Sequence, residues 1–556
     1  MIVDWRNRFG RLWITSVRDQ GGSQNCWAFA MTALYEAMVR IEHSLWTRRS
    51  EGEAARGTGK QAWDLGNLGE AGIFVERYGL ADPDCFPWSE AAALYTSKPH
   101  AASMAATPLS TTSDRSGRTM RIGAGAMTSL STAAQKKQWI DLVGPVAVMI
   151  TPPSDFGALR DGVYVPTAAG PGPAHALLVV GFNDVEQYWV VKNSWGTGWG
   201  VGGFGKVGYA ANIIEPAGAI GVRGTNPDPW TRRRLRTGVL VQGGNGGFRN
   251  NFELFVRQGL TLEHWFRDNA DSKLPWYRVG VVRSADVWRD TFHDDALDCP
   301  AVVQSTFNRD YELVYRSTFG RLRHVYFDQA SRWWNDATLL GPTNPVGIPG
   351  FVQSNRGAPG DFEIVVVTAD GKAEHWTKHN SAPWTRPAGE WYFQQRFGHD
   401  LAHGGPALVQ SRLGVTGVPE NGQGELHFVA TTGSGRLQHY ARTGGGWQLL
   451  GSFGQNVTSA PCLIEGTYGA GNEINVGNFE LCVAVASGQI EHWWRHNSSA
   501  SAWSRSAVFG SAVSRVVALL QGSYATNLEL IAELTNGTYQ HYWRDGGGWH
   551  AGVVII

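Results

Sequence analysis

The stretch Gln20-Gly21-Gly22-Ser23-Gln24-Asn25-Cys26-Trp27-Ala28-Phe29 places a lone cysteine where a glycine-containing loop meets a helical pattern. Large apolar side chains then recur at alternating steps of four and three residues: Trp27, Met31, Leu34, Met38, Ile41 and Leu45. This spacing is typical of a single apolar stripe along a helix. The sequence therefore predicts a buried central helix with Cys26 at its N-terminal end.

A cysteine at a helix start has chemical consequences. The first amide N–H groups of a helix have no intrahelical partner and carry partial positive charge. A thiolate is stabilised there, so the pKa of Cys26 is predicted to fall below the usual value of about 8.5. The alternative is a buried and inert thiol, which is a common state of free cysteine. The helix start alone leaves both interpretations open.

Two later stretches decide between them. Ala174-His175-Ala176 opens an apolar run that predicts a buried strand, and Lys192-Asn193-Ser194-Trp195-Gly196 ends a second one. Together with the Cys26 stretch, these motifs resemble the papain family of cysteine peptidases over roughly residues 1–222. Several separated motifs in the family's order are more specific than any one of them.

The resemblance implies an α+β domain in which a helical half packs on a β-rich half, with the active site in the cleft between them. It implies Cys26 as the nucleophile and His175 as the proton carrier across the cleft. It also implies that Asn193 orients the imidazole, that Gln20 donates to the oxyanion, and that Trp195 covers the His–Asn pair. No cofactor is expected.

Several residues depart from the family pattern. Ser23 stands where secreted relatives usually have a half-cystine, and Gln24-Asn25 replace the usual Gly-Ser. Cys85 is the other cysteine in this part, so a disulfide there would consume Cys26. With five cysteines in the whole chain, this pattern mildly favours a reducing compartment.

Length and charge limit the remaining possibilities. A chain of 556 residues predicts two or three domains. Its 48 basic and 48 acidic residues balance, which argues against nucleic acid as a partner. No apolar run approaches the roughly 20 residues of a membrane span. The first residues lack a secretory leader and a propeptide, so we expect either trimming or synthesis without one, and the compartment stays open.

The sequence also predicts local structure in this first part. We expect a loop over residues 47–60, a helix over 69–78 that ends at Gly79, and a crossing loop over 99–116. A further helix is expected over 132–142, with Ser131 as its cap.

Beyond residue 222 a unit recurs six times around a histidine. The six histidines are His264, His324, His375, His439, His492 and His541. A short run ending in Gln or Glu precedes each one, and a tryptophan follows: Trp276, Trp333, Trp384, Trp447, Trp503 and Trp549. Four short strands per repeat are typical of a β-propeller blade.

The chain is therefore predicted to be multidomain, with an α+β papain-like domain followed by an all-β propeller. Six blades are favoured and seven are possible, because Trp230 resembles a stray closing strand. The predicted division is a peptidase domain over 1–222, a linker or stray strand over 223–238, and the propeller over 239–556.

Alternate residues of a strand share a face, and one face of the repeat combines an acceptor, an aromatic ring and a cation. Its members are Glu263, Trp265, Arg267, Glu374, Trp376, Lys378, Gln438, Tyr440, Arg442, Glu491, Trp493, Arg495, Gln540, Tyr542 and Arg544. Such a set suits a sugar, and it resembles the repeated sites of bacterial propeller lectins of the fucose-binding type. The alternative is that these side chains form blade cores in a structural or protein-binding propeller.

Three functional hypotheses follow. The first is an endopeptidase whose propeller docks on glycans or on a protein and so raises the local substrate concentration. The second is a multivalent lectin with an inactive papain-like domain, and the third is acyl transfer by the same Cys-His-Asn chemistry. No metal is expected, because the repeat histidines lack paired ligand spacing.

Overall fold

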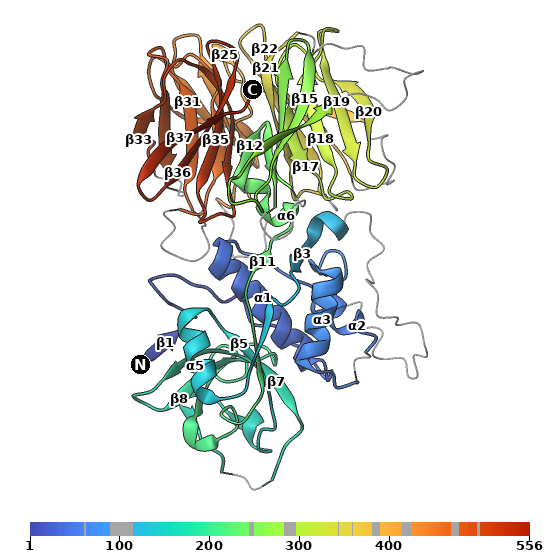
Figure 1. The fold of residues 1–556 in the computed structure, drawn as a ribbon, viewed down its shortest axis with the longest axis vertical. Coiled ribbons are helices and arrows are strands. Elements are labelled where there is room, and N and C mark those ends of the chain that lie inside the picture. The colour runs from blue at the N-terminus through green and yellow to red at the C-terminus, as the bar shows by residue number, and fades with distance from the viewer. Residues whose placement is uncertain are drawn as a thin grey trace. The chain divides into compact units, whose positions relative to one another are not determined.

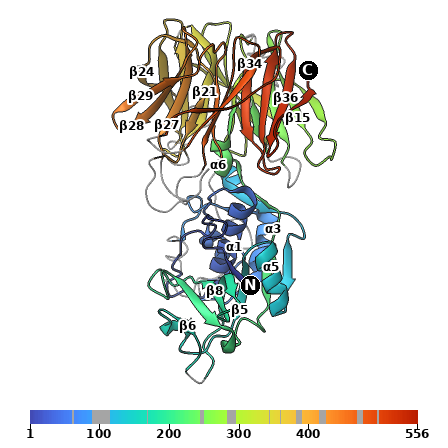
Figure 2. The same cartoon turned by 90° about the vertical axis from the view of Figure 1, so that its left-hand side faces the viewer.

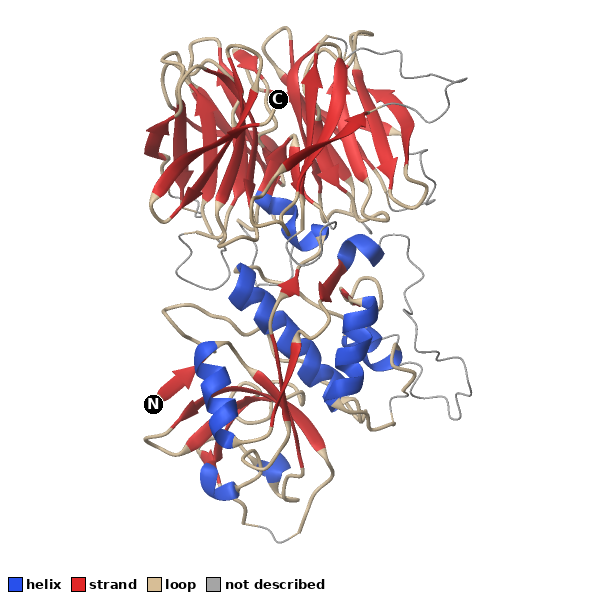
Figure 3. Ribbon diagram, in the orientation of Figure 1, coloured by secondary structure: helices blue, strands red, loops and turns tan. Residues whose placement is uncertain are grey.

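The computed structural model describes residues 1–556 except 61–62, 89–114, 168–169, 244–249, 283–295, 343, 358–359, 381–389, 414–423, 469–476 and 497–500. The described chain divides into an N-terminal unit, Met1–Asp228, and a C-terminal unit that starts at Pro229. Figures 1 and 3 show helices concentrated in the first unit and strands filling the second. The predicted crossing loop over 99–116 lies mostly outside the described residues.

The helical half of the N-terminal unit is built around the predicted central helix. Its helices are α1 (Cys26–His43), α2 (Glu51–Arg56) and α3 (Leu68–Tyr78). The expected helix over 69–78 is confirmed, and it ends at Gly79, which has a φ of 71°. The expected loop over 47–60 is wrong, because Ser50 caps α2 by accepting a hydrogen bond from the backbone N–H of Glu53.

The β half contains one eight-stranded sheet in the order β4-β10-β5-β7-β8-β9-β6, with β1 paired to β7. Its strands are β1 (Ile2–Asp4), β4 (Met127–Leu130), β5 (Val146–Ile150), β6 (Val163–Tyr164), β7 (His175–Asn183), β8 (Tyr188–Lys192), β9 (Phe204–Gly208) and β10 (Ala219–Val222). Helix α5 (Ala133–Leu142) belongs to this half, and Thr132 caps it instead of the predicted Ser131. Every residue of β7 is buried, and α1 packs against that strand.

Residues 224–228, which we call the strap, lie at the end of the N-terminal unit and connect its β half to its helical half. Strand β11 (Thr225–Asn226) pairs with β3 (Thr119–Ile122), which in turn pairs with β2 (Leu80–Ala81). Glu42 in α1 accepts hydrogen bonds from the backbone N–H groups of Gly224 and Thr225, each at 2.7 Å. Residues 224–228, part of the predicted linker, therefore belong structurally to the helical half.

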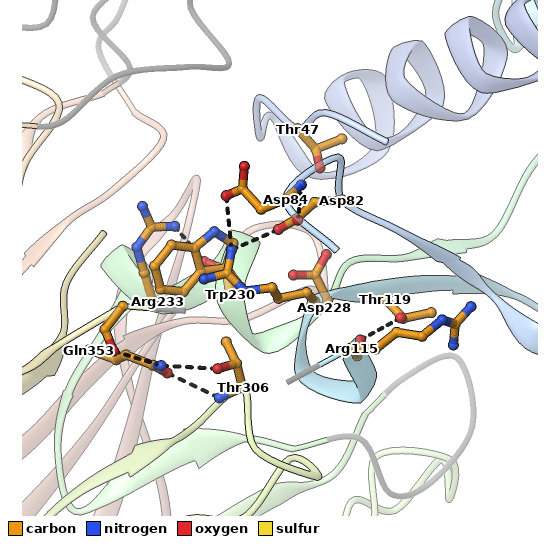
Figure 4. Close-up of polar contacts among 12 residues, drawn as sticks. Thr47, Asp82, Asp84, Arg115, Thr119, Asp228, Trp230, Arg233, Thr306 and Gln353 are labelled. Atoms are coloured by element: carbon orange, nitrogen blue, oxygen red, sulfur yellow. Dashed lines mark hydrogen bonds and ion pairs between the residues drawn. The ribbon is translucent and has the colours of Figure 1, made fainter. Parts of the chain in front are cut away.

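Buried ion pairs tie the strap and its neighbours to the helical half. Arg49 Nη1 lies 3.0 Å from Asp228 Oδ2, and both side chains are 1% exposed. Nearby, Arg118 Nη1 contacts the buried Asp82 at 3.0 Å and also lies 3.4 Å from Asp84, whose side chain is exposed (Figure 4). Such pairs are costly to break once formed, because a single remaining charge would stay buried.

Apart from a short helical segment at its start, the described part of the C-terminal unit is all-β and forms six antiparallel sheets. Sheet 1 contains β13 (Leu240–Gln242), β14 (Phe252–Gln258), β15 (Thr261–Arg267) and β16 (Trp276–Val281). Sheet 2 contains β17 (Ala301–Gln304), β18 (Tyr311–Arg316), β19 (Leu322–Asp328) and β20 (Trp333–Leu340). Sheet 3 contains β21 (Pro345–Gln353), β22 (Phe362–Thr368), β23 (Ala373–Lys378) and β24 (Trp391–Phe397).

The other three sheets follow the same hairpin order. Sheet 4 contains β25 (Leu401–His403), β26 (Leu408–Gln410), β27 (Leu426–Thr432), β28 (Leu437–Thr443) and β29 (Gly446–Phe453). Sheet 5 contains β30 (Cys462–Glu465), β31 (Phe479–Ala484), β32 (Ile490–Arg495) and β33 (Ser504–Phe509). Sheet 6 contains β34 (Val513–Gln521), β35 (Leu528–Leu534), β36 (Tyr539–Asp545) and β37 (Gly548–Val554). Figure 2 shows the neighbouring strands β27, β28 and β29 of sheet 4.

Sheet 6 gains a fifth strand from the start of the unit. Strand β12 (Arg236–Gly238) pairs with β34, which joins the beginning of the C-terminal unit to its end. Trp230, expected to mark this strand, lies instead in the short helix α6 (Pro229–Arg232). Proline is well suited to the first position of a helix, because its missing N–H would have no partner there.

Glutamine side chains connect successive sheets. Gln353 of sheet 3 accepts a hydrogen bond from the backbone N–H of Thr306 at 3.0 Å and donates to its hydroxyl at 3.0 Å (Figure 4). The same contact, from a first-strand Gln or Glu to a backbone N–H of the preceding sheet, recurs at Gln410–Asn355, Glu465–Arg412, Gln521–Thr467 and Gln242–Ser523. The last of these connects sheet 1 to sheet 6.

Candidate active site

Cys26 is the first residue of α1 and is 2% exposed. The carbonyl of Asn25 accepts the first helical hydrogen bonds, from the N–H groups of Ala28 and Phe29. Burial raises the pKa of the Cys26 thiol, and this effect outweighs the backbone N–H groups of Ala176 and Trp27, which lower it. The predicted lowering of this pKa is therefore wrong for the resting site. Removing a thiolate from water destabilises it by more than the hydrogen bonds from these amides stabilise it.

His175 begins β7, and Asn193 follows the end of the neighbouring strand β8. The imidazole Nε2 lies 2.7 Å from Asn193 Oδ1, and His175 is 4% exposed. This contact fixes the ring and leaves Nδ1 as its other nitrogen. Burial lowers the pKa of His175 to about 4, although the hydrogen bond to Asn193 opposes the shift. Trp195 covers the imidazole, with ring centroids 4.4 Å apart.

The Gln20 side chain is held at both ends of its amide. Its Oε1 accepts a hydrogen bond from the Ser194 hydroxyl at 2.6 Å, and its Nε2 donates to the Ser23 carbonyl at 2.6 Å. These contacts fix which end of the amide carries nitrogen and direct that end toward the loop before Cys26. An amide nitrogen has two N–H donors, so one can serve Ser23 while the other serves a ligand.

A polar layer lies behind these residues, around a cavity of about 20 Å³ between α1 and strands β7 and β8. Its lining includes Glu36, Glu51, Arg18 and Lys192. Burial, together with the nearby Glu36, raises the pKa of Glu51 to about 7, although Arg18 opposes the shift. The cavity has room for about one water molecule.

The structure therefore assembles the predicted catalytic residues from distant parts of the N-terminal unit. Gln20 and Cys26 come from the loop and the start of α1, and His175, Asn193 and Trp195 come from the β half. The contacts join His175 to Asn193 and Trp195, and Gln20 to Ser194. All five cysteines lie among the described residues, and all five are buried free thiols.

In the C-terminal unit, the repeat histidines are interior residues. Five of them contact a buried glutamate on the preceding strand: His264–Glu253, His324–Glu312, His375–Glu363, His492–Glu480 and His541–Glu529, at 2.6–2.9 Å. A tryptophan of the next sheet contacts several of these rings, as Trp549 Nε1 does by donating to His492 Nδ1 at 3.2 Å. The sequence motif at the repeat histidine thus marks packing between sheets. The predicted Trp384 lies outside the described residues.

The predicted sugar-binding face is brought together only in part. Trp265 Nε1 donates to Glu263 at 3.0 Å, and the pairs Trp376–Glu374 and Trp493–Glu491 repeat this contact. Tyr440–Gln438 and Tyr542–Gln540 are its neutral counterparts. Glutamate or glutamine and the aromatic ring therefore lie together in five sheets.

The basic residues of the predicted sets have other contacts. Arg267 is 4% exposed, donates to Asn269 and lies 3.5 Å from Glu529 of sheet 6. Arg495 donates to the carbonyl of Ser501. Arg544 lies over the Tyr468 ring, and Lys378 is buried. Among the described residues, Arg442 Nε is buried and has no hydrogen-bond partner.

The fourth strands supply arginines that the sequence analysis missed. Arg278 Nη2 and Arg505 Nη1 each donate to the glutamate of their own sheet at 2.7 Å, and Arg396 lies 3.8 Å from Glu374. Arg278 and Arg505 stand two residues after the repeated tryptophan, which is the signal that could have revealed them.

Comparisons with known proteins agree with the N-terminal site. The family model described as papain family cysteine protease matches residues 1–219. Digestive cysteine proteinase 2 of Homarus americanus is 29% identical over 217 residues, which is 38% of this chain and 62% of that protein. Cathepsin L2 of Homo sapiens is 27% identical over 222 residues, which is 38% of this chain and 61% of that protein. The chain thus spans about 60% of the length of these relatives.

Among solved structures, the Carica candamarcensis cysteine protease CMS1MS2 in complex with E-64 matches 40% of this chain and 97% of its own chain. The sequence identity is 22% and the TM-score is 0.32. The sequence matches identify residues 1–219 as a papain-like cysteine protease domain. The relatives that match this domain are named as a cysteine proteinase and a cathepsin.

Membrane-spanning helices and metal sites are the other features to consider. In the described ranges, no helix is long and apolar enough to cross a membrane. Likewise, no group of three His, Cys, Asp or Glu side chains among the described residues is arranged to hold a metal ion.

Proposed function

We propose that this protein is an endopeptidase that hydrolyses peptide bonds through Cys26, His175 and Asn193. The observation that carries the proposal is the 2.7 Å contact between His175 and Asn193 under the Trp195 ring. This contact orients the imidazole as the third member of a catalytic triad does. The fixed amide of Gln20 adds a donor that points toward the loop preceding the nucleophile.

The chemistry follows from these groups. The Cys26 proton passes to His175, and the thiolate attacks the carbonyl carbon of the scissile peptide bond. The Cys26 backbone N–H and the Gln20 amide stabilise the oxyanion. The C–N bond breaks as His175 protonates the leaving amine. Water, deprotonated by His175, then hydrolyses the thioester, releasing the new carboxylic acid and restoring the thiol.

The raised pKa of Cys26 and the lowered pKa of His175 bear on the first step. Burial favours the neutral form of each group separately. Proton transfer from one to the other creates two opposite charges together, so each stabilises the other. The active pair is therefore a thiolate and an imidazolium formed jointly.

We further propose that residues 239–556 form a six-bladed β-propeller. Six antiparallel sheets, the Gln or Glu contacts that link sheets 3, 4, 5 and 6 each to the preceding sheet, and the Gln242–Ser523 contact from sheet 1 to sheet 6 support a closed ring. The pairing of β12 with β34 supports closure by the two ends of the unit. In a propeller, radial repetition of such sheets leaves only short, protected edges.

The propeller is proposed to bind glycans or a protein and to hold substrate near the peptidase. The clusters Glu263–Trp265–Arg278 and Glu491–Trp493–Arg505 favour glycans, because each combines an acceptor, a ring and a forked donor. A lectin with an inactive peptidase domain is the competing possibility.

Labelling with an irreversible thiol-directed epoxide tests the peptidase proposal. Intact mass is compared for the wild type, Cys26→Ala and Cys85→Ala. One adduct in the wild type and in Cys85→Ala, absent from Cys26→Ala, is expected, because all five thiols are buried and only an activated one reacts. Absence of any adduct on folded, reduced protein would contradict an active site, and glycan-array binding by the same sample would favour the lectin.

A further inference from the structure

Sheet 4 breaks the histidine–glutamate pairing of the other sheets. In the other five, a buried glutamate of the second strand contacts the repeat histidine of the third. In sheet 4 that position holds His427, whose Nδ1 lies 3.0 Å from His439 Nε2. The two imidazoles are 0% and 2% exposed, so a histidine replaces a carboxylate inside the repeat.

Two hydrogen-bond donors determine which nitrogens of this pair carry protons. They are Arg495, at the end of β32, and Trp503, immediately before β33. Arg495 Nη1 and Trp503 Nε1 each lie 3.2 Å from His439 Nδ1. Guanidinium and indole nitrogens only donate, so His439 Nδ1 must accept and carries no proton. Its proton is therefore on Nε2, which donates to Nδ1 of His427. The proton of His427 then lies on its Nε2.

The surroundings offer little compensation for an added proton. The charged side chain nearest His427 Nε2 is Glu425, with its Oε2 at 3.7 Å, and the glutamate side chain is 34% exposed. Arg495 supplies a positive charge at the other end, and the Phe479 ring of sheet 5 packs on His427 with centroids 4.8 Å apart. Across the described elements packed against the pair, the titratable and charged groups that face it are thus Glu425 and Arg495.

We propose that the contact between sheets 4 and 5 is an acid-sensitive latch, closed while both imidazoles are neutral and opened when they gain protons. A proton on either ring places a second positive charge beside Arg495 in a buried site. In the other sheets the equivalent proton would rest between an imidazole and a carboxylate. The latch therefore arises from the single exchange of glutamate for histidine.

The direction of the pKa shifts agrees with this geometry. Burial, and secondarily Arg495, lowers the pKa of His427 to about 3, and burial also lowers the pKa of His439. An opened histidine has a pKa of about 6.5. The open state thus binds more protons, so the closed latch loses stability as the pH falls from about 6.5 toward 3.

Hydrogen exchange of the full chain carrying Cys26→Ala, which prevents self-digestion, tests the latch at pH 7 and pH 5. After correction for intrinsic exchange, strands β28 and β32 should lose protection by about 30-fold for each histidine that is protonated on opening. Strand β19 of sheet 2, with its Glu312–His324 pair, is the internal reference and should change far less.

Substitutions decide the assignment. His427→Glu restores the pairing of the other sheets and should abolish the excess loss in sheets 4 and 5, whereas Glu480→His should introduce such a loss in sheet 5. If His427→Glu does not fold, His427→Asn keeps an acceptor for His439, removes one titrating group, and should reduce the loss by about 30-fold. Equal loss in β19 and β28, or an undiminished loss in the folded His427 variants, would overturn the proposal.

Discussion

The two units of this protein use histidine in opposite ways. In the N-terminal unit, the motif around His175 occurs once; its imidazole contacts the uncharged Asn193, and the backbone N–H of the next residue, Ala176, reaches the buried Cys26 thiol. In the C-terminal unit, the motif recurs six times, and five of its histidines contact buried glutamates that stabilise the fold. A carboxylate partner holds charge in place, whereas an amide partner orients the ring and leaves its proton available.

The comparison shows that a residue repeated in every sheet and a residue that occurs once indicate different roles. A side chain that recurs in every sheet, such as the histidine paired with Glu480, serves packing that all sheets share. Exceptions to the repeat deserve a separate explanation. Glu465 is such an exception, since it replaces glutamine in its series; burial raises its pKa, although the guanidinium of Arg234 opposes the shift. His427 is another.

The largest effect is expected for the nucleophile. Cys26→Ala should reduce kcat for peptide hydrolysis by at least about 10⁴-fold, because no other group can form the thioester. Its far-UV circular dichroism and unfolding temperature should stay close to those of the wild type. Cys85→Ala is the matched control and should retain activity. Residual activity in Cys26→Ala above that of a buffer control without enzyme would place the catalytic centre elsewhere.

A smaller but still large effect is expected on the stability of the C-terminal unit. Glu480→Ala leaves His492 buried beside an empty position, so it should lower the free energy of unfolding by about 3–5 kcal/mol. Glu390→Ala, at an exposed position, should change it by no more than about 0.5 kcal/mol. Urea unfolding monitored by tryptophan fluorescence measures both. Equal effects would mean that the repeat pairs do not stabilise the sheets.

Gln20→Ala tests how far the N-terminal unit depends on a single polar donor. Loss of one oxyanion donor should reduce kcat by about 10²–10³-fold, or about 2.7–4 kcal/mol, with little change in KM. The neighbouring Gln24 is exposed, and Gln24→Ala is expected to leave kcat unchanged. A change confined to KM would show that Gln20 binds the substrate without stabilising the transition state.

Much of this arrangement could be predicted from the sequence, for a physical reason. The α1 stripe from Trp27 onward and the buried run after His175 have periodicities that fix the element type. The short motifs around Cys26, His175 and Asn193 kept the family order, so the site could be assembled before the structure was known. The repeats were equally visible because each unit builds the same contacts.

The remaining errors arose where long-range context decides. The raised pKa of Cys26 depends on burial by elements far along the chain, which the helix start does not reveal. The role of Arg267 was misassigned because strand alternation predicts a face but not whether a neighbouring sheet covers it. Glu529, which lies 3.5 Å from Arg267, comes from the other end of the C-terminal unit.

The smallest effect on stability is expected at the surface, and it separates binding from packing. Arg278 is 48% exposed and donates to Glu263, so Arg278→Ala should shift the unfolding temperature by no more than about 2 °C. If the Glu263–Trp265–Arg278 cluster binds glycans, the same substitution should abolish the contribution of sheet 1 in a glycan-binding titration. Arg267→Ala is the contrasting variant, because the buried Arg267 guanidinium packs on Phe252. Its loss should lower the stability of the protein and should have a smaller effect on glycan binding, since the proposed binding clusters stay intact. Unchanged glycan binding in Arg278→Ala, together with reduced binding in folded Arg267→Ala, would favour the originally predicted site, which contains Arg267 and not Arg278.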